Sequence, residues 1–106
     1  MKVELLHVRD CPNHLSTLQI VKDVLRESGL PLDVIEIEIA SGSQAENYAF
    51  PGSPTVRVDG SDVEPGLSGL TSSGVSCRSY VVNGKRQGMP DCDWIVKAIR
   101  SRQSEL

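Results

Sequence analysis

This chain begins with a short run of β-forming residues. A Cys-Pro pair follows, and after it come apolar residues at helical spacing. Residues 2–8 (KVELLHV) are typical of a buried strand. Pro12 suits the first position of a helix, where its missing N–H is not needed, and this places Cys11 at or beside the N-cap. Gly29 and Pro31 are expected to end the helix. Its predicted apolar face consists of Leu15, Leu18, Val21, Val24 and Leu25.

The middle of the chain continues this alternation of strands and helices. Residues 32–40 (LDVIEIEIA) alternate isoleucine with glutamate. This pattern predicts a strand with one solvent-exposed face, near a sheet edge. Ser43 and Glu46 have the spacing of a capping box for a short helix that ends at about Phe50. A third strand is predicted over residues 54–58, closed by an Asp-Gly turn.

The last third of the chain begins with a segment that has no hydrophobic period. Residues 61–76 are rich in glycine and serine without a period, and we expect a long flexible loop there. Residues 77–82 (CRSYVV) predict a fourth strand, turned by Asn83-Gly84. Asp91 is a suitable N-cap for a last helix, and the polar tail 101–106 is expected to fray.

These elements predict one α/β domain over residues 1–106 in the order β-α-β-α-β-β-α. The first strand–helix–strand unit is expected to be parallel and right-handed. The two later strands are expected to be antiparallel. The predicted architecture is a four-stranded mixed sheet flanked by helices.

Charge and cysteine usage exclude several classes of function. Eleven Lys and Arg against 14 Asp and Glu give a net charge of −3 without a basic cluster, so nucleic acid and membranes are not expected partners. No secretory signal is recognisable, which favours a cytoplasmic location. None of the three cysteines forms a C-x-x-C pair, so neither a zinc knuckle nor a two-cysteine redox centre is predicted, and at least one thiol is free. No metal site and no cofactor are expected.

Three motifs carry a resemblance to a known family. They are Cys11-Pro12-Asn13-His14 after the first strand, the block SPTVRVDGSDVEP at residues 53–65, and CRSY at residues 77–80. Together with the element order they resemble the thioredoxin-like superfamily over nearly the whole chain. The chain looks most similar to a group of small bacterial thioredoxin-like proteins, some of them labelled alkylmercury lyase-like. The resemblance implies a thioredoxin-like fold.

Cys11 is the candidate nucleophile. Free N–H groups and the partial positive charge at a helix start stabilise a thiolate. His14, one turn later, can stabilise that thiolate when protonated or accept the thiol proton when neutral. The alternative is that Cys11 merely packs at the strand–helix junction and His14 points to solvent.

The resemblance also implies a substrate-binding role for Pro12, Ser53, Pro54 and Thr55. In thioredoxin-like proteins the proline that opens this strand follows a cis peptide bond and lies against the active cysteine. The residue before it offers backbone groups to the bound peptide or thiol. The alternative is an ordinary trans proline, which is allowed at the start of a strand.

His14 occupies the position of the second cysteine of a redox pair, and it cannot form a disulfide. The chemistry expected is therefore that of a monothiol, in which a mixed disulfide on Cys11 is resolved by a low-molecular-weight thiol or by a protein thiol. Cys77 is a possible second thiol. The alternatives are a non-catalytic binding module, or capture of a soft metal or organomercurial by the thiolate. The alkylmercury lyase label would make Cys11, Cys77 and Asp62 the reacting groups.

Five further polar residues have weaker signals. Cys92 lies at a helix start, which favours a mildly reactive thiol, although a small half-buried residue is the simpler interpretation. Asp62 and Glu64 are expected to be solvated loop charges. Arg57 and Arg78 are expected on exposed strand faces, with binding of an anionic thiol such as glutathione as the alternative.

Overall fold

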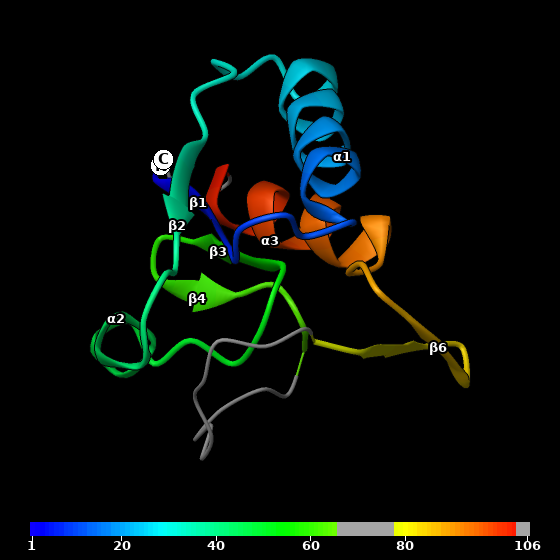
Figure 1. Ribbon diagram of the computed structural model, residues 1–106. Coiled ribbons are helices and arrows are strands. Elements are labelled where there is room, and N and C mark those ends of the chain that lie inside the picture. Colours follow the sequence, from blue (N-terminus) through cyan, green and yellow to red (C-terminus); the bar gives the residue numbers. More distant parts are fainter. Residues whose placement is uncertain (66–77, 104–106) are drawn as a thin grey trace.

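A mixed β-sheet with helices on both faces organises residues 1–65 and 78–103, the part of the chain that this computed structural model describes (Figure 1). The elements in chain order are β1 (Val3–His7), α1 (His14–Glu27), β2 (Ile35–Glu38), α2 (Gly42–Asn47), β3 (Thr55–Val58), β4 (Ser61–Asp62), β5 (Tyr80–Val82), β6 (Lys85–Gln87) and α3 (Cys92–Gln103). Within these residues, no helix is both long and apolar enough to cross a bilayer.

The sheet has the strand order β2-β1-β3-β4. β1 pairs in parallel with β2, whereas β3 is antiparallel to β1 and β4 is antiparallel to β3. The α/β class and the four-stranded mixed sheet are therefore confirmed. β2 is an edge strand, as its alternating pattern predicts.

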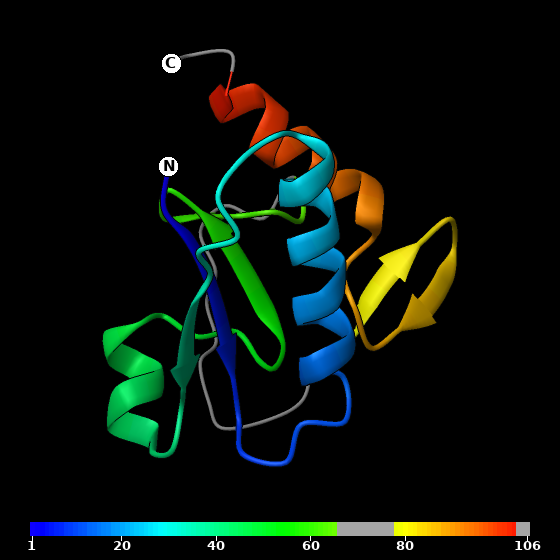
Figure 2. The ribbon, with the colours of Figure 1, turned by 90° about the horizontal axis from the view of Figure 1, so that it is seen from above.

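Two apolar clusters fill the two faces of the sheet, with α1 and α3 on one side and α2 on the other (Figure 2). Successive residues of a strand point to opposite faces, so Leu5 and Leu6 belong to different clusters. The larger cluster contains Val3, Leu5, Val21, Val24, Leu25, Val56, Val58, Val63, Ile95 and Ile99. The smaller contains Leu6, Ile39, Ala45 and Phe50.

The first helix begins two residues later than predicted. Its N-cap is Asn13, whose side chain makes no capping hydrogen bond, and Cys11 lies in the preceding turn. The N–H of Cys11 donates to the carbonyl of Val8 (3.4 Å), and the N–H of His14 donates to the carbonyl of Cys11 (3.2 Å). The prediction that Pro12 opens the helix was wrong because these tight turns precede it.

The predicted apolar face of this helix was partly wrong. Leu15 is 72% exposed, whereas Thr17, Val21 and Val24 are buried. At 3.6 residues per turn, Leu15 lies almost opposite Thr17 on the helix. Because Thr17 faces the core, Leu15 points to solvent.

The short helix α2 is capped by a different serine from the one predicted. Ser41 is the N-cap, and its hydroxyl accepts a hydrogen bond from the N–H of Gln44 (3.2 Å). The side chain of Gln44 accepts in return from the N–H of Ala40 (2.9 Å). The S-x-x-Q spacing at 41–44 therefore performs the role predicted for Ser43 and Glu46.

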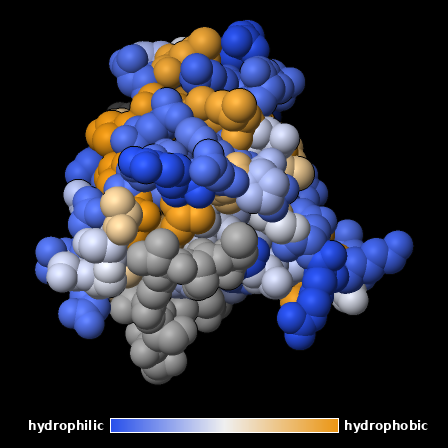
Figure 3. Space-filling model, viewed as in Figure 1, coloured by the Kyte–Doolittle hydropathy of each residue, from blue (hydrophilic) through white to orange (hydrophobic). Residues whose placement is uncertain are grey.

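The fourth strand of the sheet was predicted in the wrong segment. Asp59 and Gly60 both have positive φ, which suits a two-residue hairpin turn, so the chain folds back at once and residues 61–62 pair with β3. Residues 80–82 instead pair with β6 in a separate hairpin, turned at Asn83-Gly84. This hairpin projects from the sheet (Figure 1), and its surface is mainly hydrophilic (Figure 3).

The remaining predictions concern the ends of the described segments. Asp91 acts as predicted at the start of α3, because its carboxylate accepts from the N–H of Asp93 (3.4 Å). The helix includes residues 101–103, so the prediction that the tail frays from residue 101 was wrong for these three residues, and Gln103 donates to the carbonyl of Ser28 (3.0 Å). Residues 104–106 lie outside the described residues. Cys77 and most of the predicted loop 61–76 lie outside the described residues.

Candidate functional site

Cys11 lies in the turn between β1 and α1 with its side chain half-buried. A hydrogen bond ties this turn to the start of β3, since the N–H of Val8 donates to the Ser53 hydroxyl (3.1 Å). Val8 in turn accepts from the N–H of Cys11. The structure therefore connects the Cys11 turn with the Ser53-Pro54 segment, 42 residues later in the chain.

The Ser53–Pro54 peptide bond is cis, the isomer that the resemblance implies. Ser53, Pro54 and Thr55 are all buried. The carbonyl of Ser53 accepts from the N–H of Arg78 (2.9 Å), and the carbonyl of Pro54 accepts from the Tyr80 hydroxyl. Both carbonyls of this segment thus accept a hydrogen bond within the chain.

His14 forms its side-chain contacts with β1 and β2. Its Nε2 lies 2.8 Å from Oε1 of Glu36, and its ring stacks on that of His7 with centroids 3.6 Å apart and an interplanar angle of 10°. In the described part of the chain, no hydrogen bond joins the Cys11 thiol to His14. The imidazole is therefore oriented by a carboxylate and a second imidazole, and its link to Cys11 is through the backbone.

The cluster of His7, His14 and Glu36 was missed by the sequence analysis. Their ligating atoms all lie within 4.8 Å of one another. His7 ends β1, His14 begins α1, and Glu36 is on β2. The signal that could have found it is that the chain has two histidines in all, one at each end of the Cys11 turn. Glu36 could not have been added without the strand register.

Arg78 is buried, which corrects its expected place on an exposed strand face. Its guanidinium donates to both oxygens of Asp62 (2.7 and 3.2 Å), to Glu64 (2.7 Å) and to the Thr55 hydroxyl (3.0 Å). Its charged carbon also lies 4.3 Å from the centre of the Tyr80 ring. Burial disfavours the charged guanidinium, but the hydrogen bonds to Asp62 and Glu64 and the favourable interactions with the charge of Asp62 and with Tyr80 together outweigh this cost and raise the pKa of Arg78.

Asp62 and Glu64 are consequently not solvated loop charges, as was predicted. The carboxylate of Asp62 is 7% exposed and that of Glu64 is 21% exposed, and both are paired with Arg78. Both carboxylates are therefore directed at the Arg78 guanidinium. Asp62 therefore has a structural partner in place of the acid role that the alkylmercury lyase label would give it.

Tyr80 provides a pH-dependent test of this buried network. Burial raises the pKa of its hydroxyl; Arg78 opposes the shift, and the charges of Asp62 and Glu64 add to it. The folded state therefore holds the phenolic proton where the unfolded state loses it, so stability is complete below about pH 10 and falls above it. In Tyr48→Phe, which retains Tyr80 as the single tyrosine, phenolate absorbance should appear only together with loss of the circular dichroism signal.

This expectation would be contradicted by phenolate absorbance near pH 10 in a protein that keeps its folded circular dichroism spectrum. Urea-unfolded Tyr48→Phe is the matched control. It should titrate at about 10, the ordinary value for tyrosine.

Cys92 lies in the first turn of α3 and is exposed. Partial desolvation of the thiol raises its pKa, and the negative charges of Asp93, Asp91 and Glu27 add to the shift. Desolvation, together with the acidic surroundings, thus outweighs the helix start, which was expected to favour the thiolate. Cys92 is a poorer nucleophile at neutral pH than its helix position alone would indicate.

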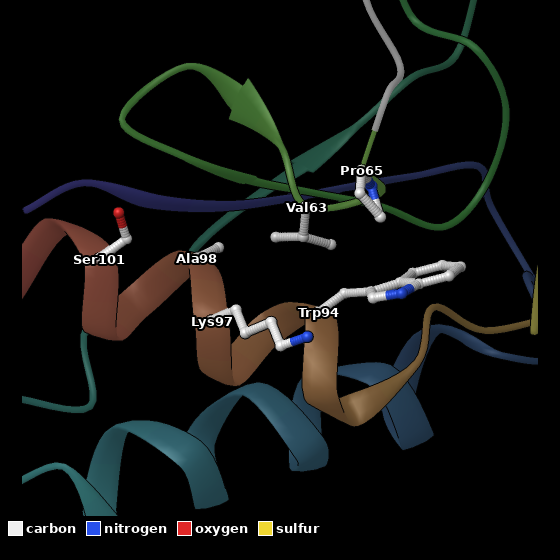
Figure 4. A pocket seen from close by; sticks show the side chains of 6 residues that line it. All are labelled: Val63, Pro65, Trp94, Lys97, Ala98 and Ser101. Carbon is white, nitrogen blue, oxygen red and sulfur yellow. The ribbon is translucent and has the colours of Figure 1, made fainter.

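A pocket of about 370 Å³ lies between α3 and the segment that follows β4 (Figure 4). Its lining is mainly apolar, with Lys97 as the charged member. The lining residues are Val63, Pro65, Trp94, Lys97, Ala98 and Ser101. Since neither Cys11 nor the Ser53-Pro54 segment is among them, the pocket is separate from the candidate site.

The chain matches no protein-family model, no curated protein and no solved structure. The candidate site is therefore defined by its own geometry. It consists of the Cys11 turn, the Ser53-Pro54 segment bonded to it, and the imidazole–carboxylate cluster beside the start of α1.

Proposed function

We propose that this chain is a thioredoxin-like domain in which Cys11 acts as a single nucleophilic thiol in thiol–disulfide exchange. The order β1, α1, β2, α2, β3, β4, α3 around a four-stranded mixed sheet supports this fold, with the β5–β6 hairpin inserted before α3. The placement of α1 and α3 on one face and α2 on the other supports it further.

The observation that carries the proposal is the hydrogen bond between the Cys11 turn and Ser53. The N–H of Val8 donates to the Ser53 hydroxyl, and Val8 accepts from Cys11. A half-buried thiol thus lies at the junction of β1, α1 and β3, the position that the family resemblance assigns to the active cysteine. Residues at such strand–helix junctions commonly carry function on a rigid scaffold.

The proposed chemistry is an exchange in two steps. The Cys11 thiolate attacks one sulfur of a disulfide RS–SR, forming Cys11–S–SR and releasing RS⁻. A second thiol then attacks the outer sulfur of this mixed disulfide and returns Cys11 as thiolate. His14 stands where a dithiol enzyme has its resolving cysteine, so the second thiol comes from another molecule. We infer that a low-molecular-weight thiol or a partner protein supplies it.

His14 takes a positioning role in this proposal. Its backbone N–H donates to the carbonyl of Cys11, while its side chain is held by Glu36. These contacts fix the start of α1 and hence the turn that carries the thiol. The general-base role that the sequence suggests has no hydrogen bond to support it in this arrangement.

The test is intact-mass analysis of the protein after exposure to glutathione disulfide at neutral pH. One glutathione adduct should form on Cys11, identified by peptide mapping, and added glutathione should remove it. Cys11→Ser should lose this adduct completely, whereas Cys92→Ser should retain it because the raised pKa of Cys92 disfavours its thiolate.

Two results would refute the monothiol proposal. If Cys11 forms no adduct while denatured protein does, the fold holds the thiol inactive, and a binding module becomes the better interpretation. If the adduct is replaced by an intramolecular disulfide in wild type but persists in Cys77→Ser, a second cysteine resolves it and the chemistry is that of a dithiol.

A further inference from the structure

We propose that His7, His14 and Glu36 form a binding site for a divalent transition-metal ion of the Zn²⁺ type. Imidazole and carboxylate are ligands that zinc accepts, and two histidines with one glutamate make a three-ligand set that leaves a coordination position open. The site uses none of the cysteines, so it does not depend on the proposed thiol chemistry. The positions of these three residues in the sequence match no known metal-binding motif.

The fold brings the three side chains to one face of the sheet. Leu5 is the register partner of Glu36, and His7 lies on the same face of β1 as Leu5 because side chains alternate along a strand. This is the face that α1 covers, and His14 is the first residue of that helix. Three elements therefore each contribute one ligand.

The distances allow coordination after small side-chain movements. The ligating atoms lie within 4.8 Å of one another, whereas a tetrahedral zinc ion with bonds of about 2.0–2.1 Å needs them about 3.3 Å apart. Two stacked parallel rings do not direct their nitrogens at a common point, so one imidazole has to rotate out of the stack. The Glu36 side chain is 42% exposed, which leaves it room to turn and leaves the ion a route from solvent.

A hydrogen bond prepares His7 for this role. Its Nδ1 lies 3.1 Å from the carbonyl oxygen of Val8, and because a carbonyl only accepts, Nδ1 carries the hydrogen. In the neutral ring the lone pair is then on Nε2. Metal-binding histidines typically donate their other ring N–H to a carbonyl or carboxylate in this manner, which fixes the ring orientation.

A hydrogen bond joins His14 to Glu36 when no metal is bound, and the metal has to replace it. The Nε2–H of His14 faces an acceptor carboxylate at 2.8 Å, so coordination through this nitrogen displaces its proton to solvent. The carboxylate then neutralises one charge of the ion. Glu38, two residues further on the same face of β2, is paired with Arg9 (3.6 Å) and does not belong to the set.

The experiment uses the full chain with Cys11, Cys77 and Cys92 replaced by serine, so that no thiolate can bind the probe. Zn²⁺ alone is titrated against the protein in competition with a chromogenic chelator. One ion should bind per chain, and the imidazole proton resonances of both histidines should shift as the ring stack opens. Glu36→Gln and His14→Gln should each weaken binding by more than about 100-fold, the upper end of the loss caused by removing an outer-shell partner.

Glu38→Gln is the matched control, since it removes the neighbouring carboxylate of the same strand and should change the affinity by less than about threefold. His14 and Glu36 are both partly exposed, so their variants should keep the wild-type circular dichroism spectrum. The proposal is overturned if the cysteine-free chain binds no zinc, or if Glu36→Gln and Glu38→Gln weaken binding equally. Because glutathione adducts are measured on chains that retain Cys11, failure of either proposal leaves the other standing.

Discussion

Arg78→Met is expected to lower the free energy of unfolding by about 3–5 kcal/mol, because it removes the cation from a buried ionic cluster. The side chains of Arg78 and Asp62 are both almost fully buried, and Glu64 is mostly buried. Methionine can fill much of the volume of arginine, but it leaves the carboxylates out of water without a counter-charge. The Thr55 hydroxyl loses a donor as well. Urea unfolding followed by circular dichroism measures the change.

Two comparisons separate loss of the charge pair from loss of packing. Arg57 lies on β3, the strand that pairs with β4, and it donates an exposed hydrogen bond to the carbonyl of Ala49. Arg57→Met removes this bond and should lower the free energy of unfolding by less than about 1 kcal/mol. Adding Asp62→Asn and Glu64→Gln to Arg78→Met removes the uncompensated charges and should restore more than about half of the lost stability. Equal costs for the Arg78 and Arg57 variants would show that the cluster contributes no more than a surface contact.

Gly52→Ala is expected to destabilise the fold by about 2–4 kcal/mol, from steric overlap and backbone strain together. Gly52 has a φ of +140°, a backbone conformation that residues other than glycine rarely adopt. A Cβ atom there would lie 2.8 Å from Cβ and 3.2 Å from Cα of Arg78. These atoms are fixed by the backbone, so relief requires Arg78 to move away from its carboxylate partners. Thermal and urea unfolding give the measurement.

Two other glycines isolate the steric part of this effect. Gly60 also has positive φ, +86°, but no atom within 4 Å of the added Cβ, so Gly60→Ala should cost about 1–2 kcal/mol from strain alone. Gly42, at the start of α2, has open space and no unusual φ, so alanine should be neutral or stabilising there by up to about 1 kcal/mol. If Gly52→Ala costs no more than Gly60→Ala, close approach of Arg78 is not the reason for the glycine.

The elements with a clear period were predictable from the sequence, and those set by tertiary pairing were not. The isoleucine–glutamate alternation predicts β2 and its edge position because the period of two is a local pattern, although burial follows it only in part, with Ile37 half-buried and Ile35 exposed. β4 is two residues long and has no period of its own; it exists because Asp59 and Gly60 turn the chain back on β3. The Asp59-Gly60 pair predicts a turn, but it does not by itself predict that residues 61–62 pair with β3.

In the candidate site, too, the residues marked by a local pattern were predictable and those placed by tertiary contacts were not. A cysteine before a helix and a proline before a strand are local features, so Cys11 and Pro54 could be named in advance. The burial of Arg78 could not, because it depends on Asp62 and Glu64, 16 and 14 residues away. The contact of His14 with Glu36 depends on the register between β1 and β2, which no local pattern specifies.

The edge position of β2 has a consequence for self-association. The outer side of an edge strand offers backbone groups that a second copy can pair with, and natural sheets often carry charges there to prevent it. Ile35 is 47% exposed on this strand, which would favour such pairing, but Glu36 and Glu38 are exposed beside it. Two copies meeting edge to edge would bring four carboxylates together within a few residues, and the Arg9 of each copy, 3.6 Å from Glu38, would offset this repulsion only in part. The glutamates of β2 thus act against the growth of a continuous intermolecular sheet.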